Sequence, residues 1–293
     1  MNYRELIKDK KKIVVKIGSS SITHESTGNI NYRKLEKLVR ILCDIKNQGK
    51  DVVLVSSGAI AVGRQTVGIK RSNVLAEKQA CAAIGQCRLM MTYQKLFSEY
   101  NQNTAQVLMT KITIVNDISR HNAQNTFSEL LKMGVIPIVN ENDTIATEEI
   151  VIGDNDNLGA ILAKNIHADL YIILSDIDIV GADLLVLLSD IDGLFTDDPN
   201  KNKEAKRIPL VNQITDEMLE MAKGPSTDLG TGGMSSKLGA AGIANDAGAD
   251  MIIINGNDMD NINRVFAGEE IGTLFTAHKT RHFHLKNYLE QTN

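Results

Sequence analysis

The sequence predicts an α/β protein in which mainly parallel strands alternate with helices. Three observations predict it: short apolar runs recur along the chain, amphipathic helical patterns lie between them, and small or polar residues come after the strongest runs. Parallel strands need crossover connections, which helices of this length supply. Because ligands of open α/β sheets bind at the carboxyl ends of the strands, the polar residues after these runs are the first candidates for a functional site.

The expected elements succeed one another along the chain. The first strand, 13–17, is a short apolar run that ends at a glycine, and the helix expected at 31–48 repeats apolar residues at helical spacing up to Gly49. The other strands are expected at 51–55, 104–109, 135–139 and 248–254, and the other helices at 73–85, 86–100, 117–132, 157–165 and 238–247. No Pro- or Ser-rich linker interrupts them, so we expect one domain over residues 1–276 and a tail over 277–293.

The composition narrows the class of protein. Of the 293 residues, 43% are hydrophobic and 23% are charged, and the net charge of −4 argues against a nucleic-acid binder. No apolar run is long enough for a transmembrane helix, and residues 1–12 lack the apolar core of a secretory signal. Cys43, Cys81 and Cys87 show no metal-binding spacing, which predicts reduced thiols and a cytoplasmic location.

One stretch of the sequence occurs twice. Residues 168–181 (ADLYIILSDIDIVG) and 182–195 (ADLLVLLSDIDGLF) align without a gap, and the second copy begins directly after the first. Each copy is an apolar run of strand length followed by Ser-Asp-Ile-Asp, and two copies are too few for a repeat architecture. We expect one copy to be the strand of a site, and the other to lie at an edge, in a hairpin or in a loop.

A glycine-rich loop has the residues that bind a polyphosphate. Residues 227–238 include three glycines, two serines and a lysine: Gly230, Gly232, Gly233, Ser235, Ser236 and Lys237. The glycines let the backbone approach an anion, the other side chains add donors, and the helix expected behind the loop points its N–H groups toward the ligand. The spacing is not that of a Walker A motif. The alternative interpretation is a flexible surface loop.

Four other polar segments lie at the ends of expected elements. They are Lys16 with Gly18-Ser19-Ser20, Ser57-Gly58-Ala59, Asn140-Glu141-Asn142-Asp143 and Gly153-Asp154-Asn155-Asp156. Each of the last two, taken alone, also suits an Asx-turn or a helix N-cap. Together the segments suit phosphoryl transfer, since Lys16 and Lys237 could neutralise the transferring group and Asp156 could orient both lysines. The motifs of serine hydrolases, zinc proteases and dinucleotide-binding dehydrogenases are absent.

In these segments the chain resembles the glutamate 5-kinase family of the amino acid kinase superfamily, in the form without a C-terminal PUA domain. The matching motifs are VVKIGSS (14–20), VSSGAI (55–60), AIGQ (83–86), NEND (140–143), GDNDNL (153–158) and GTGGMSSK (230–237). The resemblance covers roughly residues 12–276. It implies a three-layer α/β/α sandwich with a mainly parallel central sheet, the amino acid kinase or carbamate kinase-like fold. It also implies ATP-dependent phosphorylation of the L-glutamate side-chain carboxylate to gamma-glutamyl 5-phosphate, the first step of proline biosynthesis.

The resemblance implies a role for each candidate residue. Lys16 and Lys237 would stabilise the transferring phosphoryl group, and Asp156 would organise the two lysines. The residues that would bind glutamate are Ser57, Asp143 and Asn155. The residues that would bind the nucleotide are Lys16, Ser189, Asp190, Thr231, Gly232, Gly233, Met234, Ser235, Ser236 and Lys237. No cluster of Cys, His or carboxylate residues in the sequence looks like a dedicated metal site, so we expect Mg²⁺ to be carried with ATP.

The two copies of the repeated stretch differ after the shared Ser-Asp-Ile-Asp. Only the second continues into Gly193-Leu194-Phe195 as the family does, and Gly193 accepts a positive φ that the β-branched Ile179 of the first copy resists. We therefore expect Ser189 and Asp190 to face the nucleotide. The reverse arrangement is favoured by the helix expected at 157–165, which leads directly into the first copy.

The resemblance also implies proline as a feedback inhibitor, a homo-oligomer, and a functional link to glutamyl phosphate reductase. Two alternative functions stay open at the level of the sequence. One is another amino acid kinase, with an acetylglutamate- or aspartate-kinase-like activity, against which the NEND run argues. The other is a binding or regulatory homologue whose catalysis is impaired by the duplicated strand 168–195.

Overall fold

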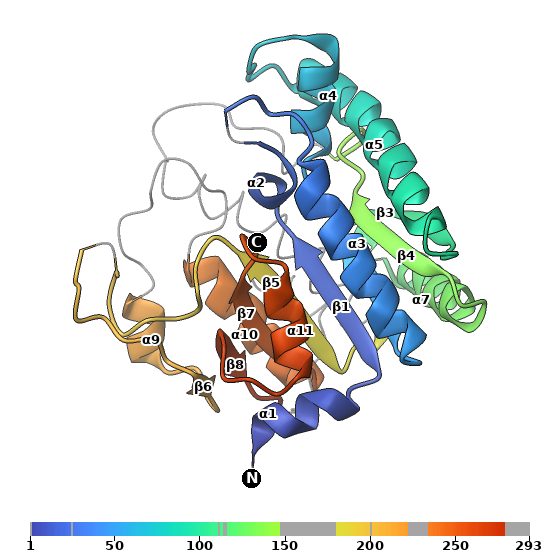
Figure 1. Cartoon of the computed structure of the whole chain (residues 1–293). Helices are drawn as coiled ribbons and strands as arrows, with labels where there is room; N and C mark the ends of the chain where they lie inside the picture. Colours follow the sequence, from blue (N-terminus) through green and yellow to red (C-terminus); the bar gives the residue numbers. More distant parts are fainter. Residues whose placement is uncertain are drawn as a thin grey trace.

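The computed structural model describes residues 2–24, 26–110, 112–113, 116–146, 180–199, 201–221 and 234–278, and their elements form one layered domain (Figure 1). In this part of the chain eight strands make one sheet in the order β3-β4-β2-β1-β5-β7-β8-β6. The pairs are parallel except for the antiparallel pair of β7 and β8. The strands are β1 Lys12–Ile17, β2 Asp51–Val55, β3 Thr104–Met109, β4 Ile136–Glu141, β5 Leu184–Ser189, β6 Leu210–Val211, β7 Asp250–Asn255 and β8 Thr273–Phe275.

Helices cover both faces of the sheet. The helices are α1 Tyr3–Leu6, the 3-10 helix η1 Ile7–Asp9, α2 Ser19–Ile22, α3 Tyr32–Asn47, α4 Ala59–Val67, α5 Leu75–Ser98, α7 Asp117–Lys132, α9 Asp216–Met221, α10 Met234–Ala247 and α11 Asp260–Phe266. Figure 1 shows α3, α5 and α11 in front of the sheet and α7 and α10 behind it. The three-layer α/β/α sandwich with a mainly parallel sheet is confirmed.

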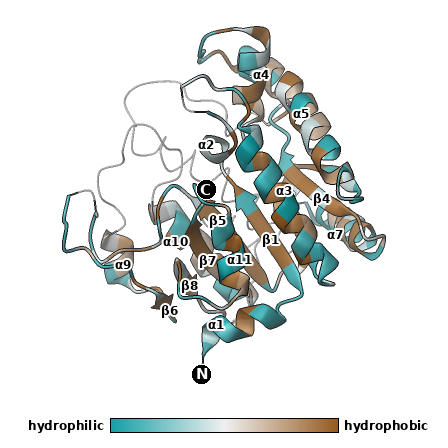
Figure 2. Cartoon of the chain, in the orientation of Figure 1, coloured by the Kyte–Doolittle hydropathy of each residue, from teal (hydrophilic) through white to brown (hydrophobic). Residues whose placement is uncertain are grey.

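The alternation of side chains along β1 divides the apolar core between the two faces. Val15 and Ile17 pack with the buried side chains of α3 and α5, whereas Val14 packs with Phe127 of α7 and Leu238 of α10. Figure 2 shows the consequence: β1 is brown over most of its length, while α3 carries both brown and teal, as an amphipathic surface helix does. The central strands of the sheet are therefore buried on both sides except at their ends, where polar groups can face a ligand.

Several predicted elements have the predicted bounds, because local signals fix their ends. The strands at 51–55 and 104–109 and the helix at 117–132 are confirmed residue for residue. The side chain of Asn116 caps α7 by accepting the Ser119 N–H at 2.9 Å, and Gly134 comes after the helix with φ of 72°. Caps of this kind can be recognised in the sequence before any packing is known.

The prediction of two helices at 73–85 and 86–100 was wrong, because α5 runs unbroken through both. Gly85 does not end the helix: it lets α5 approach the backbone of α4. A Cβ on Gly85 would lie 1.8 Å from the Ala59 carbonyl oxygen, and one on Gly63 would lie 1.8 Å from the Cys81 carbonyl oxygen. The two glycines allow the helices to cross with their backbones in contact. The sequence pattern did not predict α4.

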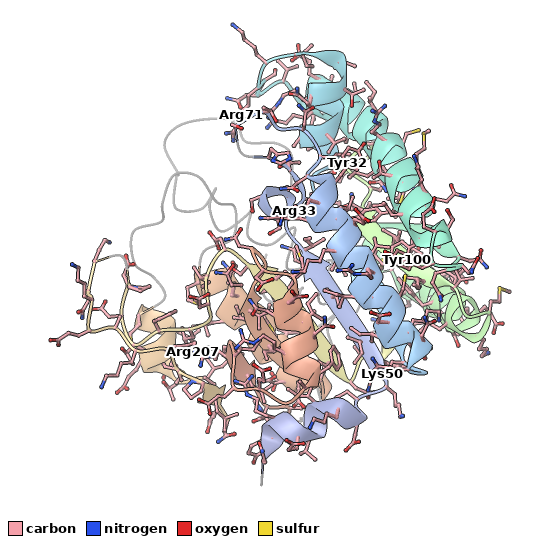
Figure 3. All side chains as sticks on the ribbon, viewed as in Figure 1. Tyr32, Arg33, Lys50, Arg71, Tyr100 and Arg207 are labelled. Atoms are coloured by element: carbon pink, nitrogen blue, oxygen red, sulfur yellow. The ribbon has the colours of Figure 1, made fainter. Side chains whose placement is uncertain are left out.

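Some basic side chains hold the backbone carbonyls of neighbouring segments. Arg4 donates to the carbonyls of Ile271 and Pro209 at 2.6 Å each, and Arg207 donates to that of Glu270 at 3.0 Å. Lys50 donates to two carbonyls of the segment before β1, and burial lowers its pKa. Figure 3 shows Lys50 at the lower end of the molecule, away from the carboxyl ends of the central strands, and Arg207 on the left-hand side. These cations therefore have a structural role.

Some predictions lie outside the described residues. The helix expected at 157–165 is one, and of the first copy, 168–181, only Val180 and Gly181 are described. The second copy forms β5. The division into a domain over 1–276 and a tail over 277–293 stays a prediction. Within the described residues, no helix combines the length and the apolarity needed to cross a membrane.

Candidate active site

The central strand β1 brings the candidate segments together. Lys16 is aligned with Val55 of β2 on one side and with Leu187 of β5 on the other. Ser57 and Ser189 each lie two residues beyond these partners. Because the three strands are parallel, their carboxyl ends meet at one edge, about 4.8 Å apart from strand to strand. A lysine therefore lies between the end of β2 and the end of β5.

Lys16 and Lys237 lie on the same face of the sheet. Along β1 the side chain of Lys16 shares a side with Val14, which packs against the layer containing α10. Helix α10 begins at Met234 and leads at its other end to Asp250, the first residue of β7. Its first turn, with Lys237, therefore lies toward the carboxyl edge. A Cβ on Gly18 would lie 4.0 Å from the Lys16 Nζ, so this ammonium group lies over the turn after β1.

The segment after β2 is tied to the end of β1. The Ser57 Oγ donates to the Ile17 carbonyl at 3.2 Å. Gly58 has φ of +91°, and a Cβ there would lie 3.1 Å from the Cβ of Ser19 and from the Cδ1 of Ile22. The left-handed conformation and the lack of space both favour glycine. The segments that carry Lys16 and Ser57 thus form one packed unit.

The segment after β4 is a tight turn held by backbone hydrogen bonds and by the side chain of Asn140. The Asn140 amide donates to the Gln86 Oε1 at 2.7 Å and accepts the Glu141 N–H at 3.0 Å. The Asn142 carbonyl accepts the N–H groups of Ile145 and Ala146 at 3.1 and 3.0 Å. Asp143 lies half-buried within this turn. The adjacent β2 and β4 therefore present Ser57 and Asp143 at the same edge of the sheet.

The segment after β5 belongs to the second copy of the repeat. Ser189 is buried and its Oγ donates to the Asp190 carboxylate at 2.9 Å. Asp192 accepts the Asn255 amide at 2.8 Å, which joins this segment to the end of β7. Gly193 has φ of +135°, as its place in the sequence led us to expect. The second copy is therefore the one that lies in the sheet next to β1.

The structure describes only some of the predicted site residues. Lys16, Ser57, Asp143, Ser189 and Asp190 lie at the carboxyl edge of the sheet, and Met234, Ser236 and Lys237 lie in the first turn of α10. Asn155, Asp156, Thr231, Gly232 and Gly233 lie outside the described residues, as does the side chain of Ser235. The role of each residue toward a ligand stays a prediction.

Sequence reasoning gave no role to two residues that support this edge, Gln86 and Tyr93. Gln86 stood in a matching motif, and the hydrogen bond to Asn140 now explains its position. Tyr93 is buried and its hydroxyl lies 2.9 Å from the Ser56 Oγ. It gave no signal in the sequence, since one tyrosine on the apolar face of a helix is typical of a core residue.

A pocket of about 300 Å³ lies away from these strand ends. Three parts of the chain line it: the turn before α3, helix α4 and helix α5. Its lining includes Tyr32, Gln65 and Arg88, and none of the predicted site residues that the structure describes. Figure 3 shows Tyr32 near the amino end of α3. This pocket is distinct from the strand ends described above.

A model of the amino acid kinase family matches the chain in two stretches, residues 11–180 and 178–255. The first stretch includes nearly all of the first copy of the repeat, and the second stretch includes the whole second copy. The break in the match therefore falls where the sequence is duplicated.

Curated relatives agree with this family. The glutamate 5-kinase of Clostridium perfringens is 46% identical over 281 residues, which are 94% of this chain and 99% of the relative. Those of Carboxydothermus hydrogenoformans (48%, 95% of this chain, 71% of the relative) and Listeria monocytogenes (43%, 96% and 98%) are similar.

The solved structures share the fold. An isopentenyl phosphate kinase of T. acidophilum has a TM-score of 0.58 at 15% identity, covering 90% of this chain and 100% of its own. The UMP kinase of Bacillus anthracis has a TM-score of 0.57 at 16% identity, covering 94% and 99%. At such identities the likeness shows the fold alone, and it confirms the predicted amino acid kinase fold. The chain therefore belongs to the amino acid kinase family and, within it, to the glutamate 5-kinases.

Proposed function

We propose that this protein transfers the γ-phosphoryl group of ATP to the side-chain carboxylate of L-glutamate, giving gamma-glutamyl 5-phosphate in the first step of proline biosynthesis. One observation carries the proposal: in a chain that glutamate 5-kinases match almost end to end, Lys16 lies between the ends of β2 and β5. A cation at the meeting point of two polar strand ends suits a reaction in which two anions must approach each other.

The glutamate side of the site is the edge formed by β2 and β4. The Ser57 hydroxyl has one proton, so it would donate to a substrate carboxylate in place of the Ile17 carbonyl, and Asp143 can accept a hydrogen bond from the α-ammonium group. We assign Asn155 to the same substrate by its motif. The hydrogen bond from Ser57 to the Ile17 carbonyl supports the assignment, since it places this segment beside the strand of Lys16.

The transfer itself needs no general base, because the glutamate carboxylate is ionised at neutral pH. A carboxylate oxygen attacks the γ-phosphorus, the bond from that phosphorus to the β,γ-bridging oxygen breaks, and ADP leaves with the electron pair. Lys16 and Lys237 neutralise charge on the transferring group, and Asp156 orients both lysines. The shared face of the sheet that carries the two lysines supports this division of roles.

The nucleotide lies on the β5 side. Ser189 and Asp190 would contact it from the sheet, and Thr231, Gly232, Gly233 and the first turn of α10 would bind its phosphates. α10 has 14 residues, enough for its amino end to favour an anion. Mg²⁺, when bound, supplies further neutralisation of the phosphates, and we propose that it arrives with ATP and is held mainly by phosphate and water. Among the described residues, no three His, Cys, Asp or Glu side chains gather as a metal site.

We propose a cytoplasmic homo-oligomer that is inhibited by proline and acts together with glutamyl phosphate reductase. Free thiols at Cys43, Cys81 and Cys87 agree with a reducing compartment. We also propose that residues 1–276 form the kinase domain and that 277–293 come after it as a tail.

The test is a glutamate-dependent ATP consumption assay with hydroxylamine trapping of the acyl phosphate. We expect ADP and a hydroxamate to form together with glutamate, and neither to form with aspartate or N-acetylglutamate. Turnover with one of the other acids would reassign the substrate. ATP binding without turnover would favour the impaired regulatory homologue.

A further inference from the structure

We propose that Gln86 and Tyr93 of α5 are positioning residues for glutamate binding: they hold the ends of β4 and β2, from which Asp143 and Ser57 reach the substrate. The inference rests on the proposed function. In the proposed mechanism α5 contacts neither glutamate nor ATP, and its role is to position the residues that do.

Gln86 fixes the turn that contains Asp143. The Gln86 Oε1 accepts the Asn140 amide N–H at 2.7 Å, and the other end of the Asn140 amide accepts the Glu141 N–H at 3.0 Å. Asn140 is only 3% exposed, so water cannot replace these partners freely. With both ends of its amide engaged, Asn140 has one orientation, and the turn leading to Asp143 starts from a fixed point.

Tyr93 fixes the residue before Ser57. Its hydroxyl lies 2.9 Å from the Ser56 Oγ, and the Ser56 N–H donates to the Val139 carbonyl at 2.9 Å. Ser56 and the tyrosine ring are both buried. Burial raises the pKa of Tyr93 to about 12, so the hydroxyl keeps its proton across the physiological range. Ser56 is thereby joined to α5 by its side chain and to β4 by its backbone.

A single helix connects these two points. Gln86 and Tyr93 are seven positions apart, which is two turns, so they share the face of α5 that packs on the domain. The residue before Gln86 adds a third contact. Gly85 lets α5 touch the Ala59 carbonyl, which comes directly after Ser57 and Gly58 in the chain. Contacts from α5 therefore hold the Ser57 and Asp143 segments in place together with the direct pairing of β2 and β4, and so contribute to the span available to glutamate.

The experiment compares variants of the full chain in the hydroxylamine-coupled assay. Gln86→Leu removes the acceptor, and we expect the KM for glutamate to rise about tenfold while the KM for ATP and kcat change less than about twofold. Gln86→Glu keeps an acceptor oxygen at the same place, so it should restore most of the glutamate KM. Tyr93→Phe should raise the KM for glutamate by a smaller factor, since the ring stays buried.

Phe97→Leu is the matched control, because Phe97 is a fully buried neighbour of Tyr93 on the same helix. It should lower the Tm and leave the KM for glutamate unchanged. Equal effects of Gln86→Leu and Gln86→Glu would overturn the inference, and so would a rise in KM for Phe97→Leu as large as that for Tyr93→Phe. A wild-type protein that consumes no ATP with glutamate would instead refute the proposed function itself.

Discussion

Gly193 lies so close to Thr273 that a Cβ atom on Gly193 would stand 2.5 Å from the threonine hydroxyl oxygen. That hydroxyl accepts the Leu194 N–H at 2.8 Å and donates to the Ile208 carbonyl at 2.7 Å. The lack of space and the φ of +135° both require glycine here. The first copy of the repeat has Ile179 at the matching position, so only the second copy can take this path past β8.

Replacing this glycine should destabilise the fold strongly. Gly193→Ala combines an unfavourable φ with a steric clash, and we expect a loss of roughly 2–4 kcal/mol in the free energy of unfolding. Gly49→Ala is the control, because Gly49 has φ of +80° but no atom within 4 Å of an added Cβ. Its loss should be about 1–2 kcal/mol. Urea unfolding of both variants checks this, and equal losses would show that Thr273 moves aside.

Deleting residues 168–181 should leave a folded protein at least as active as the parent. The deletion keeps β5, Gly193 and the contact with Thr273, and it puts Ser189 at the same distance along the chain from Asn155 that Ser175 has in the parent. Deleting 182–195 instead has the same length and removes Gly193, so it should abolish the native fold. Activity and thermal unfolding of the two deletions decide the matter. An inactive 168–181 deletion beside an active parent would mean that the first copy has become necessary.

Lys16→Ala and Lys237→Ala should each lower kcat on the order of 10²–10³-fold, with a much smaller change in glutamate binding. The reason is that negative charge concentrates on the transferring phosphoryl group. Steady-state kinetics at saturating ATP and glutamate measure it. Turnover near that of the wild type in either variant would remove that lysine from the proposed mechanism.

Asp143→Ala should raise the KM for glutamate and leave ATP affinity nearly unchanged, because the carboxylate is assigned to the substrate ammonium group. Asp143→Asn keeps the shape without the charge and should behave like the alanine variant. Calorimetric titration with ATP and with glutamate separates the two ligands. Equal loss for both would indicate that Asp143 serves the turn after β4 rather than the substrate.

Tyr93 should make stability fall at high pH. Its pKa is raised from about 10 in the unfolded chain to about 12 in the fold, because burial disfavours the phenolate. The stability due to the neutral hydroxyl is thus complete below pH 10 and is lost as the pH rises toward 12. Between pH 9 and pH 11 the wild type should lose more unfolding free energy than Tyr93→Phe. Equal losses for the two proteins, measured by urea unfolding at both pH values, would contradict this.

The parts of the fold that could be predicted are those with local signals. β2 is predicted by an apolar run, and α7 by the cap at Asn116 and the glycine at its end. The crossing of α4 and α5 could not be predicted, because Gly63 and Gly85 act on partners distant in sequence. A glycine within a helical pattern indicates a break until its neighbour is known.

In the candidate site, too, only residues with a local sequence signal could be predicted. Lys16, Ser57 and Asp143 could be recognised because each lies at or just beyond the end of a strand, and parallel strands end at one edge. Gln86 and Tyr93 act through side chains that meet Asn140 and Ser56 only after the layers have packed. No sequence pattern predicts these two side-chain contacts.

The pairing of β1 with β5 joins segments that the ribosome makes far apart in time. Ile13 is aligned with Leu184, and everything from Gly18 to Asp183 must be synthesised between the two strands. At about 5–20 residues per second, one edge of β1 stays uncovered for roughly 10–30 s of synthesis. An open apolar edge is a template for pairing with other chains, so this interval is a period of aggregation risk. The first matching apolar run to be synthesised is the copy that lacks the glycine, directly ahead of the one that forms β5.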